Sequence, residues 1–348
     1  RSHFGSSSQA FPRASSHLPL LLCTLVLLIV AMDTCVDQSS ELAKESIDAG
    51  SEYVPLADLD GPDADAVVAG ALQRSGFLLV RSSEMSAALL QRALRACREL
   101  LSDSAPGVER HPSDPKSYRM LRRADLEPPP ESCSEVGAGA SASSTAEAKA
   151  YAALSEYWTA LSAVKHRLLR ALARGLGLEA DFLASKHGQG NDSLRLLRYP
   201  PAPGAGNRCK EHSDYGTITL LGTDGTAGLE IWDDASGLWV PVPDGFAAAG
   251  VAEGDRATLV VNAGSLLSGW TRGAVRATLH RVAGPSSKQS ASPPQCLHDA
   301  ASRHRYSIAL FVDPDPDLEL RSVAGDDPLP PEASGSVADY VRWRCGAA

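Results

Sequence analysis

Short apolar runs separated by Gly- and Pro-containing turns dominate the second half of the chain. After residue 190 such runs occur at 194–199, 217–221, 229–232, 239–242, 258–261, 277–282 and 306–312. Many short strands at this spacing predict a β-sandwich or a barrel, and a double-stranded β-helix, or jelly roll, is one such solution. A ligand site is expected at the mouth of this fold.

The first half of the chain has a helical pattern instead. Residues 66–76 predict a helix that leads into an apolar strand at 77–80. Residues 86–101 place apolar side chains at helical spacing, which predicts an amphipathic helix. A second long helix is expected over 151–174, before Gly175 and Gly177. The predicted class is therefore mainly β with flanking α-helices.

These patterns divide the chain into four regions. We expect a leader at 1–50, an N-terminal helical region at 51–185, the β-rich domain at 186–315 and a C-terminal segment at 316–348. Two stretches interrupt them. Residues 126–149 have almost no large apolar side chain and predict a disordered surface insertion. Residues 284–302 are polar and rich in Pro and Ser, and we expect them to loop out of the sheet.

The leader contains a hydrophobic segment from Leu18 to Met32, which is apolar apart from Thr24. It is short for a membrane span of about 20 residues. Its length fits the apolar core of a signal peptide, roughly 7–15 residues. Three interpretations stay open: a targeting signal, a membrane anchor, or a leader that precedes true initiation at Met32.

Composition narrows the classes of partner. The chain has 348 residues, 43% hydrophobic and 22% charged, which is enough to bury a sizeable core. A formal net charge of -9 argues against nucleic acid or an anionic membrane surface as a general partner. Seven cysteines without a C-x-x-C pair indicate neither a zinc knuckle nor a disulfide framework. We therefore expect a cytoplasmic location for the catalytic domain, with organelle targeting or membrane anchoring through residues 18–32 as the alternative.

His212, Asp214 and His280 carry the most informative chemistry in the sequence. Side chains at i and i+2 of an extended segment point to the same side, so His212 and Asp214 can face one ion. His280 lies in a strand-like segment that could return beside them. Two imidazoles and one carboxylate leave metal positions open, as in non-haem Fe(II) oxygenases. The alternative is that both histidines are ordinary hydrogen-bonded residues.

Arg305 and Ser307 form a second candidate pair on one strand face. A guanidinium fork beside a hydroxyl can hold a carboxylate through charge-assisted hydrogen bonds. Tyr199 could add a phenolic donor at the same end, although a core tyrosine is nearly as good an interpretation. Together these residues could bind the carboxylate of a 2-oxo acid that chelates the metal.

A series of short motifs then follows along residues 53–343, in this order: Val54-Pro55-Leu56 with Asp58, Ser75-Gly76-Phe77, Arg198-Tyr199-Pro200-Pro201, His212–Leu221, Gly228–Ile231, Trp239–Val242, Val261–Gly264, Trp270-Thr271, His280–Val282 and Arg305–Ala309. Together they resemble the isopenicillin N synthase-like branch of the 2-oxoglutarate and Fe(II)-dependent dioxygenases. The most specific match is His212–Leu221.

This resemblance implies a jelly-roll core flanked by N-terminal helices and a C-terminal helix near the substrate pocket, for which Ser336–Arg344 is the candidate. It implies that His212, Asp214 and His280 ligate Fe(II), with no catalytic side chain beyond the metal site. Arg305, Ser307 and Tyr199 would bind 2-oxoglutarate. O2 would be the second cosubstrate, and ascorbate is a candidate reductant.

The implied activity is oxidation, usually hydroxylation, of a small organic molecule with release of succinate and CO2. Two alternatives remain: an oxidase that needs no 2-oxoglutarate, and a non-catalytic metal- or ligand-binding member of the fold. Leu197, Ser265 and Arg272 depart from residues common in plant members, so the resemblance does not extend to a substrate. The oligomeric state does not follow from the sequence.

Overall fold

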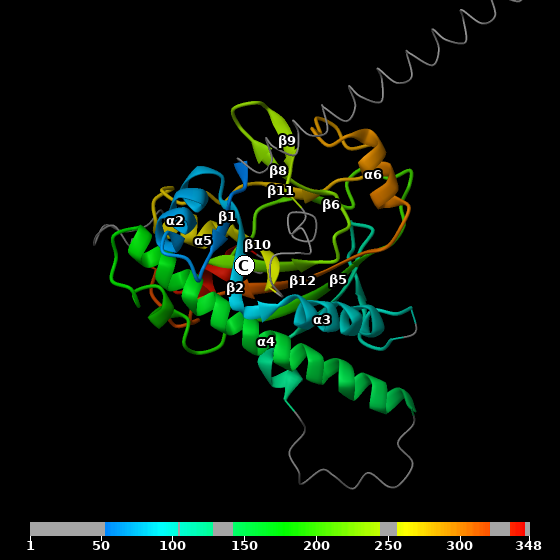
Figure 1. Ribbon diagram of the computed structural model, residues 1–348, viewed down its shortest axis with the longest axis horizontal. Helices are drawn as coiled ribbons and strands as arrows, with labels where there is room; N and C mark the ends of the chain where they lie inside the picture. The colour runs from blue at the N-terminus through cyan, green and yellow to red at the C-terminus, as the bar shows by residue number, and fades with distance from the viewer. Residues whose placement is uncertain (1–52, 104, 128–141, 244–255, 321–334, 345–348) are drawn as a thin grey trace, which may run out of the picture. The chain divides into compact units, whose positions relative to one another are not determined.

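The computed structural model describes residues 53–103, 105–127, 142–243, 256–320 and 335–344, all within one unit, 47–348. Their strands form two sheets (Figure 1). The large sheet has the order β1 (Leu56–Asp58), β2 (Phe77–Ser86), β10 (Arg256–Ala263), β7 (Ile218–Thr223), β12 (Arg305–Val312), β5 (Ser193–Tyr199), β4 (Ser117–Leu121) and β3 (Glu109–Arg110). The small sheet has the order β6 (Cys209–His212), β11 (His280–Val282), β8 (Leu229–Asp233) and β9 (Leu238–Pro241).

Side chains on the two faces of the large sheet pack into two different hydrophobic clusters. Leu196, Ile308 and Leu220 face the main core, whereas Leu197 and Ala309 belong to a smaller cluster with Cys209 and Val282 of the small sheet. Strands buried on both faces read as continuous apolar runs, which is the pattern that the sequence shows. The jelly-roll prediction is confirmed. Strand β2 pairs with β10, and β4 pairs with β5. The large sheet therefore contains strands from both of the regions that the sequence suggests, 51–185 and 186–315.

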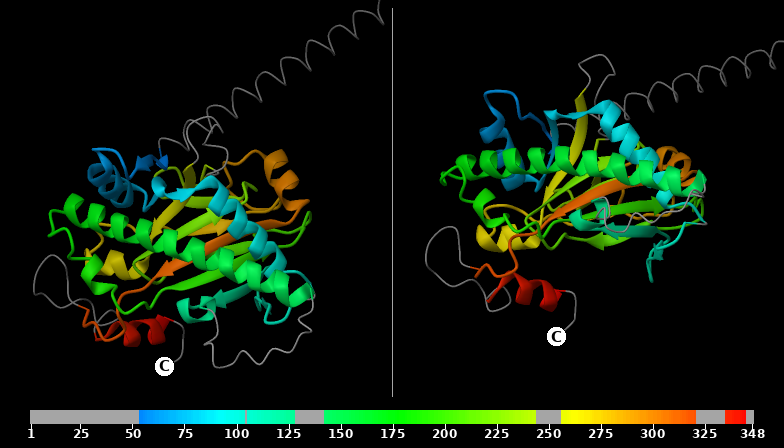
Figure 2. Two further views of the ribbon diagram at one scale, coloured as in Figure 1. Left: turned by 60° about the horizontal axis from the view of Figure 1, so that its bottom comes forward. Right: turned by 90° about the horizontal axis from the view of Figure 1, so that it is seen from below.

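Helices α3 (Ala87–Leu100) and α4 (Ala142–Gly175) cover one face of the large sheet, as Figure 2 shows. The Oγ atom of Ser86 caps α3 by accepting a hydrogen bond from the Leu89 amide at 3.1 Å. Helix α2 (Ala64–Arg74) packs against α4 and leads into β2. These helices bury their apolar faces in the main core and leave the opposite face of the sheet to the pocket.

Two parts of the predicted insertion 126–149 are wrong. Leu126 ends a short 3-10 turn, Arg123–Leu126, and is buried. Residues 142–149 already belong to α4, which begins nine residues before the predicted start at Tyr151. This stretch is rich in Ala, with Glu147 and Lys149, and these residues favour helix even without large apolar side chains. Residues 128–141 lie outside the described part of the chain, as does the leader 1–50.

The second polar stretch, 284–302, leaves the small sheet after β11 and contains α6 (Pro294–Ala301). It is tied back to the small sheet by Glu230, which is fully buried and accepts hydrogen bonds from Ser290 and from Ser292, the latter at 2.6 Å. Arg281 donates to the other oxygen of Glu230 at 2.9 Å and to the Lys288 carbonyl at 2.8 Å. The residue after the candidate ligand His280 therefore anchors the insertion.

The C-terminal helix α7 (Val337–Arg344) forms where the sequence predicts it. Ser336 caps it by accepting a hydrogen bond from the Asp339 amide at 3.1 Å. Val337 and Tyr340 are buried in the main core, and the position of this helix near the substrate pocket stays a prediction. The part of the chain that the structure describes contains no helix that is long and apolar enough to cross a membrane, and residues 18–32 lie outside that part.

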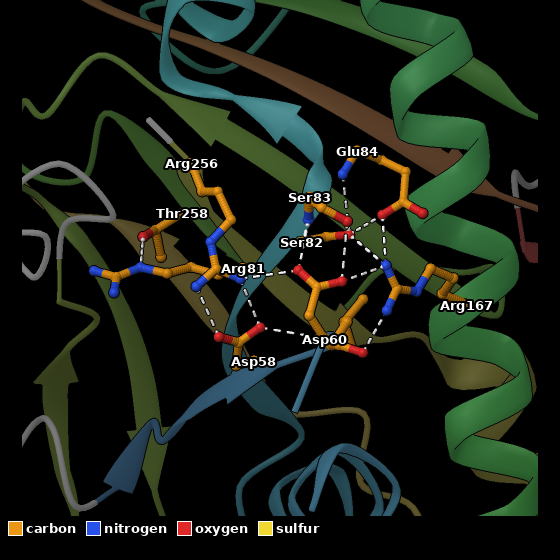
Figure 3. A network of polar contacts seen from close by, with 10 residues as sticks. Asp58, Asp60, Arg81, Ser82, Ser83, Glu84, Arg167, Arg256 and Thr258 are labelled. Atoms are coloured by element: carbon orange, nitrogen blue, oxygen red, sulfur yellow. Dashed lines mark hydrogen bonds and ion pairs between the residues drawn. The ribbon is translucent and has the colours of Figure 1, made fainter. Parts of the chain in front are cut away.

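A cluster of charged side chains joins β1, β2, β10 and α4, and Figure 3 shows it at close range. Both Asp58 oxygens accept from Arg256 at 2.8 Å. Asp60 accepts from Arg256 at 2.9 Å and from Arg167 at 2.7 Å, and Arg167 also binds Glu84 at 2.7 Å. We call these five residues the paired cluster. They fasten the first strand and the long helix to the sheet.

Candidate metal centre and pocket

His212, Asp214 and His280 come together as the sequence predicts. Strands β6 and β11 are neighbours in the small sheet (Figure 1). His212 ends β6, and His280 begins the antiparallel β11 directly opposite His212. Asp214 follows two residues after His212. The Nε2 atoms of His212 and His280 lie 3.9 Å and 3.8 Å from Asp214 Oδ1. One ligand atom from each residue lies within 4.8 Å of the others, which is compact enough to hold one metal ion.

Backbone carbonyls set the orientation of both imidazoles. His212 Nδ1 lies 2.8 Å from the Lys210 carbonyl, and His280 Nδ1 lies 3.2 Å from the Thr278 carbonyl. A carbonyl can only accept a hydrogen bond, so each Nδ1 carries the proton. In the neutral form of each imidazole, which is the form that binds a metal, Nε2 then keeps its lone pair, an arrangement usual for ligating histidines.

Asp214 is held from the side opposite the histidines. Its Oδ2 atom accepts hydrogen bonds from Thr219 Oγ1 at 2.6 Å and from Asn262 Nδ2 at 2.7 Å. Oδ1 is left facing the two imidazoles. Asn262 and Thr219 lie in motifs that the sequence shows, but the sequence assigns them no role. Their contact with Asp214 depends on the pairing of β10 with β7.

The three groups influence one another's ionisation strongly. Burial alone would raise the pKa of Asp214, but His280, His212 and the two hydrogen bonds hold it below its ordinary value. Burial, together with neighbouring His212, lowers the pKa of His280 to about 4 despite Asp214. Burial also opposes the charging of His212, yet Cys209, Asp214 and the Lys210 carbonyl raise its pKa to about 9. A carboxylate between two imidazoles is a site built for a cation.

Gly216 and Gly264 explain how the metal segment is fixed against the sheet. A Cβ atom on Gly264 would collide with the Gly216 carbonyl, and one on Gly216 would collide with Asp313 and the Val312 carbonyl. The amide of Ser265 also donates to the Asp214 carbonyl at 2.8 Å. Close packing of the backbone around Gly216 and Gly264, with the Ser265 hydrogen bond, therefore fixes the backbone at Asp214.

Arg305, Ser307 and Tyr199 line the same pocket as the three candidate ligands. Arg305 is 1% exposed; its Nε donates to the Thr226 carbonyl at 3.0 Å and its Nη1 to Ser307 Oγ at 3.3 Å. Tyr199 is directly opposite Arg305 in the register of β5 and β12, and the guanidinium carbon lies 5.2 Å from its ring centroid. Burial raises the pKa of Tyr199 to about 12, so its hydroxyl stays a donor.

The pocket also contains charged residues that sequence reasoning missed, Lys116 and Arg195. Lys116 Nζ lies 2.9 Å from both an Asp114 oxygen and the sulfur of Cys209. Arg195 is two positions before Leu197 on β5 and shares its face. The alternation on β5 was a usable signal, because Arg195, Leu197 and Tyr199 must all point to one side.

Comparison with known proteins agrees with this geometry. Residues 190–314 match the 2OG-Fe(II) oxygenase superfamily. The 2-oxoglutarate-dependent dioxygenase gloF of Glarea lozoyensis is 37% identical over 43% of this chain and 42% of its own. The 2-oxoglutarate-dependent dioxygenase htyE of Aspergillus rugulosus is also 37% identical, over 43% of each chain.

Among solved structures, a full-length Neurospora crassa protein in complex with alpha-KG has a TM-score of 0.63 at 21% identity, covering 84% of this chain and 96% of that one. This likeness shows the fold alone. The chain spans about two fifths of the length of the curated relatives that it matches. The segment 190–314 contains both histidines, the aspartate and Arg305, so the region that carries the candidate site is the region similar to the 2OG-Fe(II) oxygenase superfamily.

Proposed function

We propose that this chain is an Fe(II)- and 2-oxoglutarate-dependent dioxygenase that oxidises, in the simplest case hydroxylates, a small organic molecule. One observation carries the proposal: His212, Asp214 and His280 converge in the pocket that also contains Arg305 and Ser307. The matched superfamily and the curated dioxygenases support the same activity.

The donor set fits Fe(II). Two imidazole nitrogens and one carboxylate oxygen on one side of an ion leave its other positions open for 2-oxoglutarate and O2. When bound, the iron supplies the oxidising chemistry, in which 2-oxoglutarate is converted to succinate and CO2. The protein's contribution is to hold the ligand atoms in place, which the Lys210 and Thr278 carbonyls, Thr219 and Asn262 do.

Arg305 is the proposed anchor for the distal carboxylate of 2-oxoglutarate. Its Nε is occupied by the Thr226 carbonyl, which fixes the plane of the guanidinium and leaves N–H groups of the fork for a carboxylate. Ser307 Oγ and the Tyr199 hydroxyl offer further donors on the same side. The apolar side chains Phe77, Leu221 and Leu229 line the remaining wall of the pocket beside the ligands.

The test is an anaerobic titration of the Fe(II)-loaded chain with 2-oxoglutarate, followed by admission of O2. We expect a weak visible charge-transfer band that saturates with 2-oxoglutarate, and then succinate formation. His280→Ala should abolish the band. The absence of the band in folded, iron-loaded protein would overturn the cosubstrate assignment.

The same assay separates the alternatives. Consumption of O2 without succinate would identify an oxidase that needs no 2-oxoglutarate. Binding of iron without either would identify a non-catalytic member of the fold. If His280→Ala abolished iron binding but left the biological role intact, the non-catalytic interpretation would be correct.

We also propose that the catalytic region acts in the cytoplasm, on a small molecule rather than on nucleic acid. The net charge of -9 supports the second part, and the free thiols of Cys97, Cys209 and Cys296 support the first. Fractionation of cells that express the whole chain, compared with a version that starts at Met32, tests the location. Membrane retention that depends on residues 1–31 would overturn it.

A further inference from the structure

Arg195 is a charged pocket residue that the proposed iron and 2-oxoglutarate sites leave unused. It lies in β5, and its guanidinium carbon is 4.9 Å from the ring centroid of Phe311 and 5.3 Å from that of Tyr118. Its Nε is buried without a hydrogen-bond partner. Within the described residues, no carboxylate lies within ion-pair distance of it.

Aromatic contacts do not satisfy this group. The two ring faces attract the positive charge of the guanidinium, but they contain no oxygen or nitrogen atom that could accept a hydrogen bond from its N–H groups. A buried donor without an acceptor costs about 1–3 kcal/mol. Tyr118 is itself fixed, because its hydroxyl donates to Glu109 at 2.7 Å. The described part of the chain therefore holds Arg195 in place without giving its N–H groups an acceptor.

Arg195 and Arg305 occupy different positions along the pocket. On paired strands β5 and β12, Arg305 is opposite Tyr199, whereas Arg195 is opposite Ala309, four residues further along. Four residues of strand span about 13 Å. Phe311, which contacts Arg195, is opposite Thr219, the residue that holds Asp214. Arg195 is thus on the metal side of the pocket, away from the proposed 2-oxoglutarate anchor.

The charges that line the pocket favour the binding of a second anion in addition to 2-oxoglutarate. Three cationic side chains, Lys116, Arg195 and Arg305, line it against one carboxylate, Asp214. Asp214 faces the metal position. Lys116 is paired with Asp114 at 2.9 Å, and Arg305 is assigned to 2-oxoglutarate. Arg195 is left as the cation that a substrate would meet.

We propose that Arg195 binds a carboxylate of the primary substrate, so that the enzyme acts on a small organic acid. This inference rests on the proposed dioxygenase function. A carboxylate is planar and accepts two parallel N–H groups of a guanidinium. Seated on the free edge of Arg195, it would hold the remainder of the substrate beside the metal ligands.

The experiment compares acids with their uncharged amides. The full chain is loaded with Zn(II) in place of Fe(II), with and without 2-oxoglutarate, and binding is measured by calorimetry and ligand-observed NMR. The probes are benzoate, phenylacetate, hexanoate and L-proline, each paired with its carboxamide. We expect at least one acid to bind at least about 10-fold more tightly than its amide.

Three variants identify the residue responsible. Arg195→Met should weaken binding of that acid at least about 10-fold, and Arg195→Lys should restore part of the preference. Arg198→Met is the matched control, because Arg198 is on the same strand, does not line the pocket and pairs with the exposed Asp103. It should leave acid binding unchanged. All variants should bind 2-oxoglutarate about as tightly as the wild type and retain their cooperative thermal transition.

Equal binding of acid and amide, no binding of any acid at millimolar concentration, or unchanged binding by Arg195→Met would each overturn the inference. A loss of 2-oxoglutarate affinity in Arg195→Met would also overturn it, because Arg195 would then be a cosubstrate contact. Failure of the dioxygenase proposal would give a different result. The wild-type protein would then form no succinate, but it would still bind acids more tightly than amides in the titration without 2-oxoglutarate.

Discussion

The paired cluster and the pocket contain similar charged groups, but they differ in whether those groups are satisfied. In the paired cluster, Arg167 contacts Asp60 and Glu84, and Arg256 contacts Asp58 and Asp60. In the pocket, the Nε of Arg195 has no acceptor among the described residues. The Nε2 atoms of His212 and His280 face Asp214 Oδ1 at non-bonding distances of 3.9 Å and 3.8 Å.

The difference teaches how to recognise function in this fold. Charge alone does not mark the site, because the paired cluster also consists of charged side chains. Ligand-binding polar atoms are instead held on one side by the protein and left open on the other. Asp214 shows this within one carboxylate, since Oδ2 accepts two hydrogen bonds while Oδ1 faces the metal position.

Asp214→Asn should have the largest effect on activity, and it should distinguish the pocket from the paired cluster. An asparagine can still accept from Thr219 and Asn262 through its carbonyl oxygen, so the fold should be retained, but it removes the anionic ligand. We expect succinate formation to fall at least about 100-fold, the upper end of the loss seen when only an outer-shell partner is removed, together with loss of bound iron. Metal analysis and a succinate assay measure both. Asp58→Asn in the paired cluster is the control and should retain full iron content.

Arg305→Met is expected to have the next largest effect. It removes the buried guanidinium proposed for 2-oxoglutarate and leaves the metal ligands in place. Loss of one partner of a buried charge pair costs about 2–5 kcal/mol, so the Kd for 2-oxoglutarate should rise at least about 30-fold. Calorimetry on Zn(II)-loaded protein measures it. Unchanged affinity, or loss of metal, would show that Arg305 does not anchor the cosubstrate.

The sequence predicts the pocket better than it predicts the surroundings. His212 and Asp214 follow from a strand alternation of two residues, and the register of β6 with β11 then brings His280 opposite. Strand β6 itself was missed, because Cys-Lys-Glu-His has no apolar pattern. The roles of Asn262, Thr219 and Arg195 depend on which strands become neighbours, and no local pattern contains that information. The early start of α4 was missed because small residues were taken to indicate disorder.

His187 is a buried polar residue that resembles the paired cluster in being fully satisfied. Its ring nitrogens lie 2.7 Å from the Leu183 carbonyl and 2.9 Å from Thr217 Oγ1. Burial lowers its pKa to about 4 from an ordinary value of 6.5. The unfolded chain therefore binds more protons than the folded chain between pH 6.5 and pH 4, so stability falls as the pH falls through this window.

His187→Gln should remove this pH dependence. We expect the free energy of unfolding of the wild type to decline by up to about 3 kcal/mol more than that of the variant between about pH 7 and pH 4. Chemical denaturation at several pH values measures the difference. Parallel curves for the two proteins would mean that His187 is not kept neutral by burial.

Arg256→Met should have the smallest effect, and it completes the comparison. Arg256 binds Asp58 and Asp60, but its side chain is 32% exposed and that of Asp58 is 42% exposed. Ion pairs in contact with water contribute about 0–1 kcal/mol each, so the free energy of unfolding should fall by roughly 1 kcal/mol. Iron content and the Kd for 2-oxoglutarate should not change. A large loss of 2-oxoglutarate affinity would contradict the division between paired and open charges, because the paired cluster would then be supporting the site.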